Sequence, residues 1–253
     1  MSVTASTGSG TSTPYTGTSL SIPKEVIHGG VTCTVTDIED TQLWGGTLES
    51  VTVAADNDFL SSENGVIFNK DKTVLRWYPC GKPGTSYIVP SDVTTLKDSS
   101  FRDVSALTSV TLPASLKHIR DYVFDDCKNI ATLALPTSLE SIGDNSLDLL
   151  KVSSMAVPEH VTTLGFYVLS RCPDLRSVEL PSTLTKITWY AFSNNPVLNT
   201  VTCKATTPPV IKAGDGVFDG TPLDSATLRV PSGSKVRYQA AEGWKDFRTI
   251  EEF

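Results

Sequence analysis

The residues that could do chemistry are few and stand apart in the sequence. His28, His118 and His160 are scattered, and neither the HExxH nor the CxxC spacing of metal sites occurs. Two Ser-x-x-Lys matches begin at Ser21 and Ser232, but a pattern of four residues is weak, and no glycine-rich phosphate loop follows a predicted strand. We therefore predict that the protein is not an enzyme and uses no cofactor.

Aspartates recur at a fixed interval, since Asp98, Asp121 and Asp144 stand 23 residues apart. If that interval is one coil of a stacked structure, carboxylates about 5 Å apart would repel unless a cation neutralised them, and Ca²⁺ prefers several oxygen ligands. The alternative is that each aspartate accepts hydrogen bonds from backbone N–H groups of its own turn, as aspartate does in turns generally. We favour the alternative and predict no metal site.

Aromatic residues replace the aspartates further along the chain. Phe166 and Trp189 stand at the corresponding positions of the next two intervals, and Tyr167 and Tyr190 follow them directly. Our hypothesis is that these four rings form an exposed patch that stacks on a sugar or accepts a protein partner, because exposed aromatics are frequent anchors of interfaces. The alternative is that some of the rings turn inward and pack over the neighbouring turn.

All of these positions belong to one repeat. Residues 107–198 contain four consecutive lines of about 23 residues, anchored by Pro113, Pro136, Pro158 and Pro181 in steps of 23, 22 and 23 residues. A fixed period in this range predicts a solenoid. The segment before each proline alternates apolar and polar residues, so we expect a short strand that the proline ends and that stacks into a parallel sheet.

Three positions of each line are apolar throughout and are expected to face one continuous interior. These positions lie 6, 11 and 17 residues after the proline, and the last lies 16 residues after it in the one line that is a residue shorter. The first position is occupied by Leu96, Ile119, Ile142, Leu164 and Ile187, and the second by Phe101, Phe124, Leu147, Leu169 and Phe192. The third is occupied by Leu107, Ile130, Val152, Leu175 and Leu198. Cys127 and Cys172 share a further position two lines apart, about 10 Å, which exceeds the roughly 7 Å limit for a disulfide. We expect them to be buried thiols.

The regions outside the regular lines give the expected domain organisation. Residues 1–17 are rich in Gly, Ser and Thr and are predicted to be a flexible tether. Residues 18–253 form one repeat domain, in which a stretched first repeat, an inserted β-hairpin, the regular repeats, and an irregular repeat with a helical cap occupy 18–53, 54–86, 87–203 and 204–253. In the hairpin, Val66–Phe68 is expected to face Thr73–Trp77.

Composition excludes several classes of protein. The net charge is −7 and no Lys/Arg cluster occurs, which argues against nucleic-acid binding. No stretch approaches the roughly 18 apolar residues of a membrane helix, and no export signal follows Met1, so we expect no membrane span. The tether could equally be what remains after an export signal was removed.

Several motifs together resemble the BspA-like, treponemal-type leucine-rich-repeat proteins. The line LTSVTLPASLKHIRDYVFDDCKN is similar to their repeat, with Ile-Gly-Asp at 142–144, Ala-Phe at 191–192 and cysteine at 127 and 172. GVIFNKDKTVLRWYP is similar to the hairpin that they carry between repeats, and LRVPSGSKVRYQAAEGWKDFRTI is similar to their C-terminal cap. The resemblance implies an exported or surface-attached bacterial protein with a role in adhesion or partner binding, and no catalytic activity.

The expected fold is therefore a mostly-β α/β repeat: a right-handed leucine-rich-repeat solenoid with one curved parallel sheet, an inserted β-hairpin and a C-terminal helical cap. The expected function is that of an extracellular or cell-surface binding and adhesion module. Its partner would be a host or matrix protein or a glycan, and the chain is expected to be a monomer. The alternative is a structural scaffold or spacer within a bacterial surface assembly.

Overall fold

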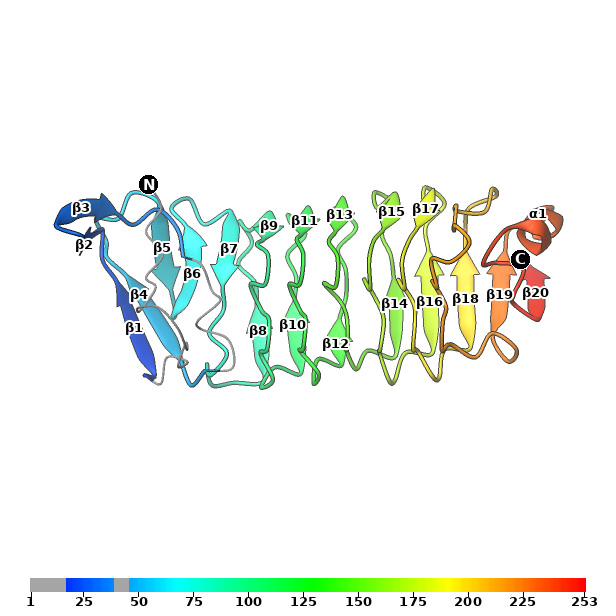
Figure 1. Cartoon of the computed structure of the whole chain (residues 1–253), viewed down its shortest axis with the longest axis horizontal. Coiled ribbons are helices and arrows are strands. Elements are labelled where there is room, and N and C mark those ends of the chain that lie inside the picture. The colour runs from blue at the N-terminus through cyan, green and yellow to red at the C-terminus, as the bar shows by residue number, and fades with distance from the viewer. Residues whose placement is uncertain (1–16, 39–45) are drawn as a thin grey trace.

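The computed structural model describes residues 17–38 and 46–253, and Figure 1 shows them as an elongated array of stacked coils. Each regular coil runs through two short strands and returns through an irregular segment. The predicted mostly-β solenoid is confirmed. The predicted tether at residues 1–17 lies outside the described residues except for Gly17.

The first strand of each coil occupies the segment that ends at the repeat's proline, although the segments with Thr200–Cys203 and Thr249–Glu252 have no proline at that position. These strands pair in parallel and in register, with Ser109 opposite Thr132 and Val110 opposite Leu133, because every coil offers the same alternating residues at the same height. They are β8 (Ser86–Ile88), β10 (Ser109–Thr111), β12 (Thr132–Leu133), β14 (Ser154–Ala156), β16 (Ser177–Leu180), β18 (Thr200–Cys203), β19 (Thr227–Val230) and β20 (Thr249–Glu252).

A second row of strands follows the proline, so the expectation of one parallel sheet is wrong. Each is two residues long and ends at the inward residue six positions after the proline. They are β9 (Thr95–Leu96), β11 (His118–Ile119), β13 (Ser141–Ile142), β15 (Thr163–Leu164) and β17 (Lys186–Ile187). The proline separates the two rows because it has no N–H to give to a ladder, and Figure 1 shows the rows one above the other.

Both rows are interrupted at the same place. β12 does not pair with β14, and β13 does not pair with β15. Between them lies the one step of 22 residues, which is a residue short in the turn that joins Leu150 to Val152. The coils on either side of this step form separate sheets.

The returning segments hold the coils together by a ladder of their own. The amide of Phe101 donates to Val123 O of the next coil at 3.0 Å, and the amide of Phe124 donates to Ser146 O at 3.0 Å. Non-glycine residues with positive φ recur in these segments, among them Tyr122 at 58° and Asp126 at 60°. The return therefore needs no helix, because each tight turn is satisfied by its neighbour.

The interior is continuous along the array. All fifteen residues predicted to face inward are buried, and Phe101 stacks on Phe124 of the next coil with ring centroids 5.1 Å apart. Cys127 and Cys172 are buried free thiols, as predicted. Stacking identical positions thus builds one core from residues that are far apart in sequence.

The N-terminal end departs from the regular period and has a small core of its own. β1 (Ser19–Ile22) pairs in parallel with β4 (Ser50–Val53), and β2 (Glu25–His28) pairs with β3 (Val31–Thr34) as an antiparallel hairpin between them. β5 (Leu60–Glu63), β6 (Val66–Asn69) and β7 (Val74–Trp77) follow as an antiparallel run, and β7 pairs in parallel with β9.

At the C-terminal end, β19 and β20 extend the first row, and α1 (Lys235–Ala240) lies between them in sequence. Tyr238 is buried, and its hydroxyl donates to Ala205 O at 2.7 Å. Trp244, also buried, donates from Nε1 to Pro209 O at 2.8 Å. Val236 is exposed, because the helix is only six residues long and its single buried position is Tyr238.

Candidate functional site

The candidate site lies where the second strand row turns into the return segment. Phe166 and Tyr167 occupy this turn in one coil, and Trp189 and Tyr190 occupy it in the next. Tyr167 and Tyr190 have φ of 48° and 59°, a left-handed conformation that is uncommon outside glycine. The turns are fixed from the following coil, since the amide of Tyr167 donates to Trp189 O at 3.1 Å and that of Tyr190 to Asp215 O at 2.8 Å.

Three of the four rings are in direct contact. Tyr167 and Tyr190 stack with centroids 5.1 Å apart and planes 13° apart, and Phe166 meets Tyr167 edge to face at 4.3 Å and 86°. Both are arrangements that the charge distribution of aromatic rings favours. Within the described part of the chain, no ring contact joins Trp189 to the other three.

The outer two rings face solvent. Phe166 is 37% exposed and Trp189 is 56% exposed, whereas Tyr167 and Tyr190 are half-buried. The alternative, that some of the rings turn inward and pack over the neighbouring turn, describes Tyr167 and Tyr190 in part, since they stack across neighbouring coils, but it does not describe Phe166 and Trp189. We call Phe166, Tyr167, Trp189 and Tyr190 the aromatic patch. Its surface offers flat apolar faces with tyrosine hydroxyls at their edges, which suits stacking on a sugar ring or on an apolar side chain.

An arginine that the sequence reasoning missed lies against the patch. The guanidinium carbon of Arg171 is 5.7 Å from the centroid of the Tyr167 ring. Its Nε donates to Asp148 Oδ1 at 3.1 Å, its Nη2 donates to Asp148 Oδ2, and Asp148 itself is fully buried. The hydrogen bond from Arg171 to Asp148 raises the pKa of the guanidinium, so the arginine stays charged.

The buried carboxylate thus fixes the position of a cation beside the patch. Ser170 adds a third hydrogen bond, from Oγ to Asp148 Oδ1 at 2.7 Å. The Arg171 side chain nevertheless remains 46% exposed, so a partner on the patch would meet a positive charge at its edge. The signal in the sequence was the spacing of 23 residues between Asp148 and Arg171, which places them on neighbouring coils.

The aspartate ladder holds backbone rather than offering an open site. Asp98 Oδ1 accepts the amide of Asp121 at 3.1 Å, Asp121 Oδ1 accepts that of Asp144 at 2.9 Å, and Asp144 Oδ1 accepts that of Phe166 at 2.8 Å. The donor therefore belongs to the next coil and not, as expected, to the aspartate's own turn. In residues 17–38 and 46–253, no three acidic, histidine or cysteine side chains are grouped as metal ligands would be.

The other candidate groups are not brought together. His28 lies on β2, His118 lies on β11 with Nδ1 2.9 Å from Ser141 Oγ, and His160 lies in the turn after β14. Burial raises the pKa of the Cys172 thiol to about 12 and raises that of Cys127 further. Both are protonated at neutral pH, and a thiol is a poor nucleophile compared with a thiolate.

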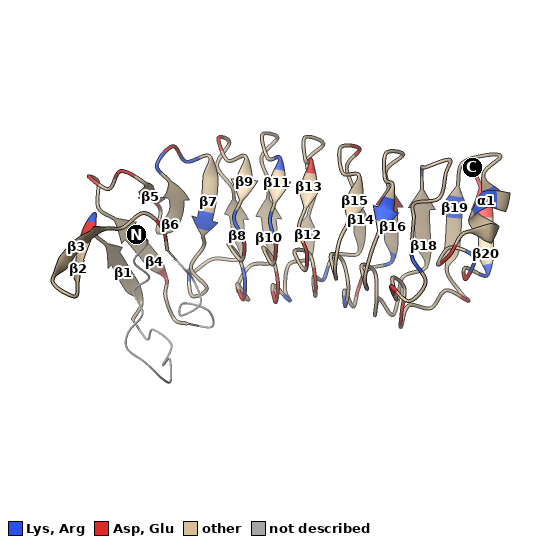
Figure 2. Cartoon of the chain, turned by 45° about the horizontal axis from the view of Figure 1, so that its top comes forward, with Lys and Arg blue, Asp and Glu red and all other residues tan. Residues whose placement is uncertain are grey.

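Charged residues are distributed along the array, with basic and acidic positions interspersed from coil to coil (Figure 2). None of the helices in the described residues is long and apolar enough to cross a membrane.

Comparison with known families places the repeat. A profile described as "BspA type Leucine rich repeat region" matches in six copies, over residues 80–199 and 148–237. These ranges include every coil from which the aromatic patch and the aspartate ladder are built. No curated protein matches the chain.

Two solved structures share the architecture. The pneumococcal vaccine antigen PcpA is 23% identical with a TM-score of 0.72, and the match covers 92% of this chain and 55% of PcpA. The leucine-rich-repeat protein TpLRR of T. pallidum is 20% identical with a TM-score of 0.55, covering 75% of this chain and 95% of TpLRR. This chain therefore spans little more than half the length of PcpA, and at these identities the likeness concerns the fold.

Proposed function

This chain belongs to the BspA-type leucine-rich-repeat family, and on that premise we propose that it is a non-enzymatic binding and adhesion module on a bacterial surface or outside the cell. Its partner is a host or matrix protein or a glycan, and no nucleic acid takes part. The chain acts as a monomer. The observation that carries the proposal is the aromatic patch, in which Phe166 and Trp189 are exposed and Tyr167 stacks on Tyr190.

The two exposed rings on consecutive coils cost the protein some stability. Burying a large apolar side chain stabilises a protein by about 1.5–3 kcal/mol relative to leaving it in water, and Phe166 and Trp189 forgo part of that gain. Neighbouring coils use the same position for an aspartate that binds backbone. A binding role explains why two consecutive coils carry a ring there instead.

The experiment is a screen of the purified protein against arrays of glycans and matrix proteins, followed by affinity measurements on each partner found. We expect the double variant Phe166→Ala/Trp189→Ala to weaken binding by more than about tenfold, as central aromatic anchors do. Tyr122→Ala is the matched control. Tyr122 is 40% exposed at the same turn of another coil, with Arg102 5.7 Å from its ring, but it lies outside the patch.

Two results would speak against the proposal. If the double variant binds as tightly as the wild type, the patch is not the contact surface. If Tyr122→Ala weakens binding equally, the effect comes from any exposed ring on this side of the array. A protein that binds nothing in either array would favour the role of scaffold or spacer in a surface assembly.

The finer features of the fold enter the proposal in the same way. We propose that the coils wind right-handed, that β6 and β7 form a hairpin inserted into the array, and that α1 with Trp244 caps the last coil. The burial of Tyr238 and Trp244 against Ala205 and Pro209 supports the cap, because a solenoid must cover its terminal core layer. The tether at 1–17 and the domain limits at 18–253 remain part of this proposal.

A further inference from the structure

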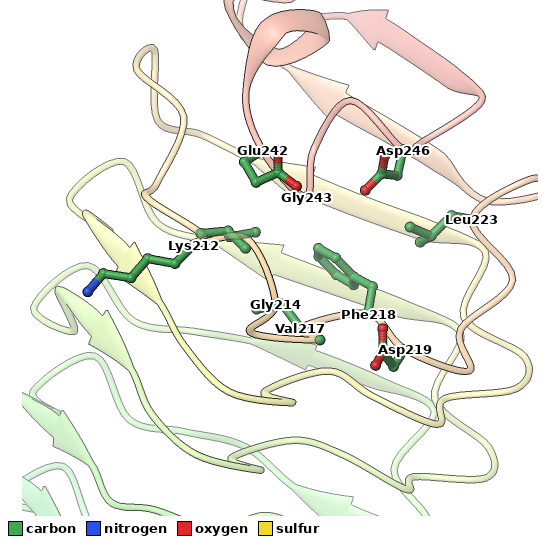
Figure 3. A pocket seen from close by; sticks show the side chains of 11 residues that line it. Lys212, Gly214, Val217, Phe218, Asp219, Leu223, Glu242, Gly243 and Asp246 are labelled. Atoms are coloured by element: carbon green, nitrogen blue, oxygen red, sulfur yellow. The ribbon is translucent and has the colours of Figure 1, made fainter.

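A pocket of about 280 Å³ opens at the C-terminal end of the array, between the last irregular coil and the loop that follows α1. Figure 3 shows the side chains that surround it. The coil contributes one wall, from Ile211 to Leu223, and the loop contributes the other, from Glu242 to Asp246. It is a site separate from the aromatic patch, although Tyr190 lies at its edge.

A glycine lies where the pocket meets the tyrosine column. Gly216 has φ of 58°, the same left-handed turn that Tyr190 makes one coil earlier with φ of 59°. The coil before that also has a tyrosine here, Tyr167, whereas at Gly216 the space for a side chain is taken up by Tyr190 and Asp219. A Cβ at Gly216 would stand 2.5 Å from Cε1 of Tyr190, so the ring of Tyr190 requires this glycine. The tyrosine column therefore ends at the pocket.

The lining of the pocket combines apolar side chains in its interior with an acidic rim, and more of the accessible lining is polar than apolar. Ile211, Val217 and Phe218 are buried side chains that form the interior. Exposed carboxylates surround the opening, contributed by Asp219, Glu242 and Asp246. In Figure 3 the Phe218 ring lies between the carboxylates of Asp219 and Asp246.

The rim carries more negative than positive charge. Glu242 pairs with Lys245 at 2.7 Å, and Lys245 also interacts electrostatically with Asp246. In the described part of the chain, neither Asp219 nor Asp246 forms an ion pair of its own. Lys212 lines the pocket with its aliphatic stem only, and its amine points away from the opening (Figure 3). A cationic group at the opening would therefore meet two carboxylates without displacing a lysine of the protein's own.

We propose that this pocket binds the side chain of a lysine or arginine presented by a protein partner. Such a side chain combines an apolar stem with a charged end, which matches the apolar side chains of Ile211 and Val217 below a carboxylate rim. The volume is slightly below the roughly 300–1,000 Å³ of pockets that enclose drug-sized ligands, so it suits one long side chain rather than an oligosaccharide.

The charge of the whole chain favours the same partner. With a net charge of −7, the protein attracts a basic segment over distances longer than the direct contact, up to about the Debye length of 8 Å at physiological salt. The inference does not depend on the aromatic patch, since no patch residue lines the pocket.

The test is an NMR titration of the ¹⁵N-labelled protein with N-acetyl-lysine amide, N-acetyl-arginine amide and the neutral N-acetyl-norleucine amide. We expect saturable shifts of the backbone amides of Gly214, Gly216 and Gly243 with the two cationic probes. The norleucine probe should bind at least about tenfold more weakly, because it offers the stem without the charge. Raising the ionic strength to about 1 M should weaken the cationic probes selectively.

Substitutions distinguish binding in the pocket from a general attraction of the cationic probes to the acidic protein. Asp219→Asn and Asp246→Asn should each weaken cationic binding by about two- to fivefold, and the double variant by about tenfold, in line with solvent-exposed ion pairs. Asp174→Asn, which removes an exposed carboxylate on a distant turn, is the matched control and should change nothing. Spectra that superimpose outside the pocket establish that the variants are folded.

The proposal is overturned if the norleucine probe binds as well as the lysine probe, or if the double variant binds like Asp174→Asn. Phe166→Ala/Trp189→Ala keeps the pocket intact, so these titrations should be unaffected by it. Loss of the pocket shifts in that variant would mean that the shifts come from the aromatic patch. The two sites can therefore fail independently.

Discussion

Replacing Gly165 by alanine tests whether the aspartate ladder holds the coils together. Gly165 directly precedes Phe166, and a Cβ at this position would overlap Asp144 Oδ1, the atom that accepts the Phe166 amide at 2.8 Å. Its φ lies outside the left-handed region, so alanine can adopt the backbone conformation. The only close neighbours of the new methyl group would be the Asp144 carboxylate atoms.

The expected magnitude follows from that single hydrogen bond. Moving the Asp144 carboxylate away forfeits about 0.5–1.5 kcal/mol, towards the upper end because the acceptor is charged. Alanine also raises the free energy of unfolding by about 0.4–1 kcal/mol, because it restricts the conformations of the unfolded chain more than glycine does. In an Asp144→Ala background the overlap is gone and only the second effect remains. Gly165→Ala should thus destabilise the wild type and stabilise Asp144→Ala, with a coupling energy equal to the lost hydrogen bond, about 1–1.5 kcal/mol.

Urea unfolding of the four proteins, followed by far-UV circular dichroism, measures the cycle. Gly143→Ala in the wild type and in Asp121→Ala provides the matched control. A Cβ at Gly143 would overlap the backbone of Arg120 and would stand 2.6 Å from Asp121 N, and removing the Asp121 side chain relieves neither contact. Gly143→Ala should destabilise both backgrounds. If Gly165→Ala has the same effect with and without the Asp144 carboxylate, the reasoning is refuted.

Three further predictions concern the interior. Phe192→Ala should lower the free energy of unfolding by about 3–5 kcal/mol in urea titrations, since Phe192 is buried and stacks on Phe218 at 5.7 Å. Of the five thiols, only Cys33 is not buried, so Ellman's reagent should titrate one thiol in the folded protein and five in denaturant. Burial raises the pKa of the Asp125 carboxyl, although Arg102 acts in the opposite direction. The folded protein therefore keeps this carboxyl protonated to a higher pH than the unfolded chain does, and the free energy of unfolding falls as pH rises through the raised pKa. Asp125→Asn removes this loss, so unfolding measured between about pH 4 and 7 should show the variant gaining stability relative to the wild type as pH rises.

The inward half of the fold is predictable from sequence because the physics there is repetitive. A position such as Phe101 or Phe124 has the same neighbours in every coil, so the requirement for an apolar residue recurs with the period. Hydrophobic burial is also non-directional, and a pattern of apolar residues therefore suffices to predict it.

Features that depend on specific contacts between particular residues were not predictable in the same way. The second strand row consists of two-residue segments, too short for an alternating pattern to register. The ion pair of Arg171 with Asp148 pairs two positions that differ by one within the repeat, so a search by equal positions passes over it. The pocket lies between an irregular coil and the loop after α1, which has no counterpart in the regular coils and supplies Glu242 and Asp246 of the acidic rim.

Phe166 separates the demands of stability from those of function, because it stands where preceding coils have an aspartate that accepts a hydrogen bond. The three preceding coils each place an aspartate here that binds the amide of the next coil, whereas a phenyl ring has nothing to offer the amide of Trp189. Phe166→Asp should restore the missing acceptor. Compared with Phe166→Ala, which loses the same edge contact with Tyr167, it should be more stable by about 0.5–1.5 kcal/mol in urea unfolding. Both variants should lose partner binding equally. If Phe166→Asp is no more stable than Phe166→Ala, an aspartate in this turn cannot accept the amide of Trp189. The phenylalanine would then be explained by the backbone geometry of the turn and not by a role in binding.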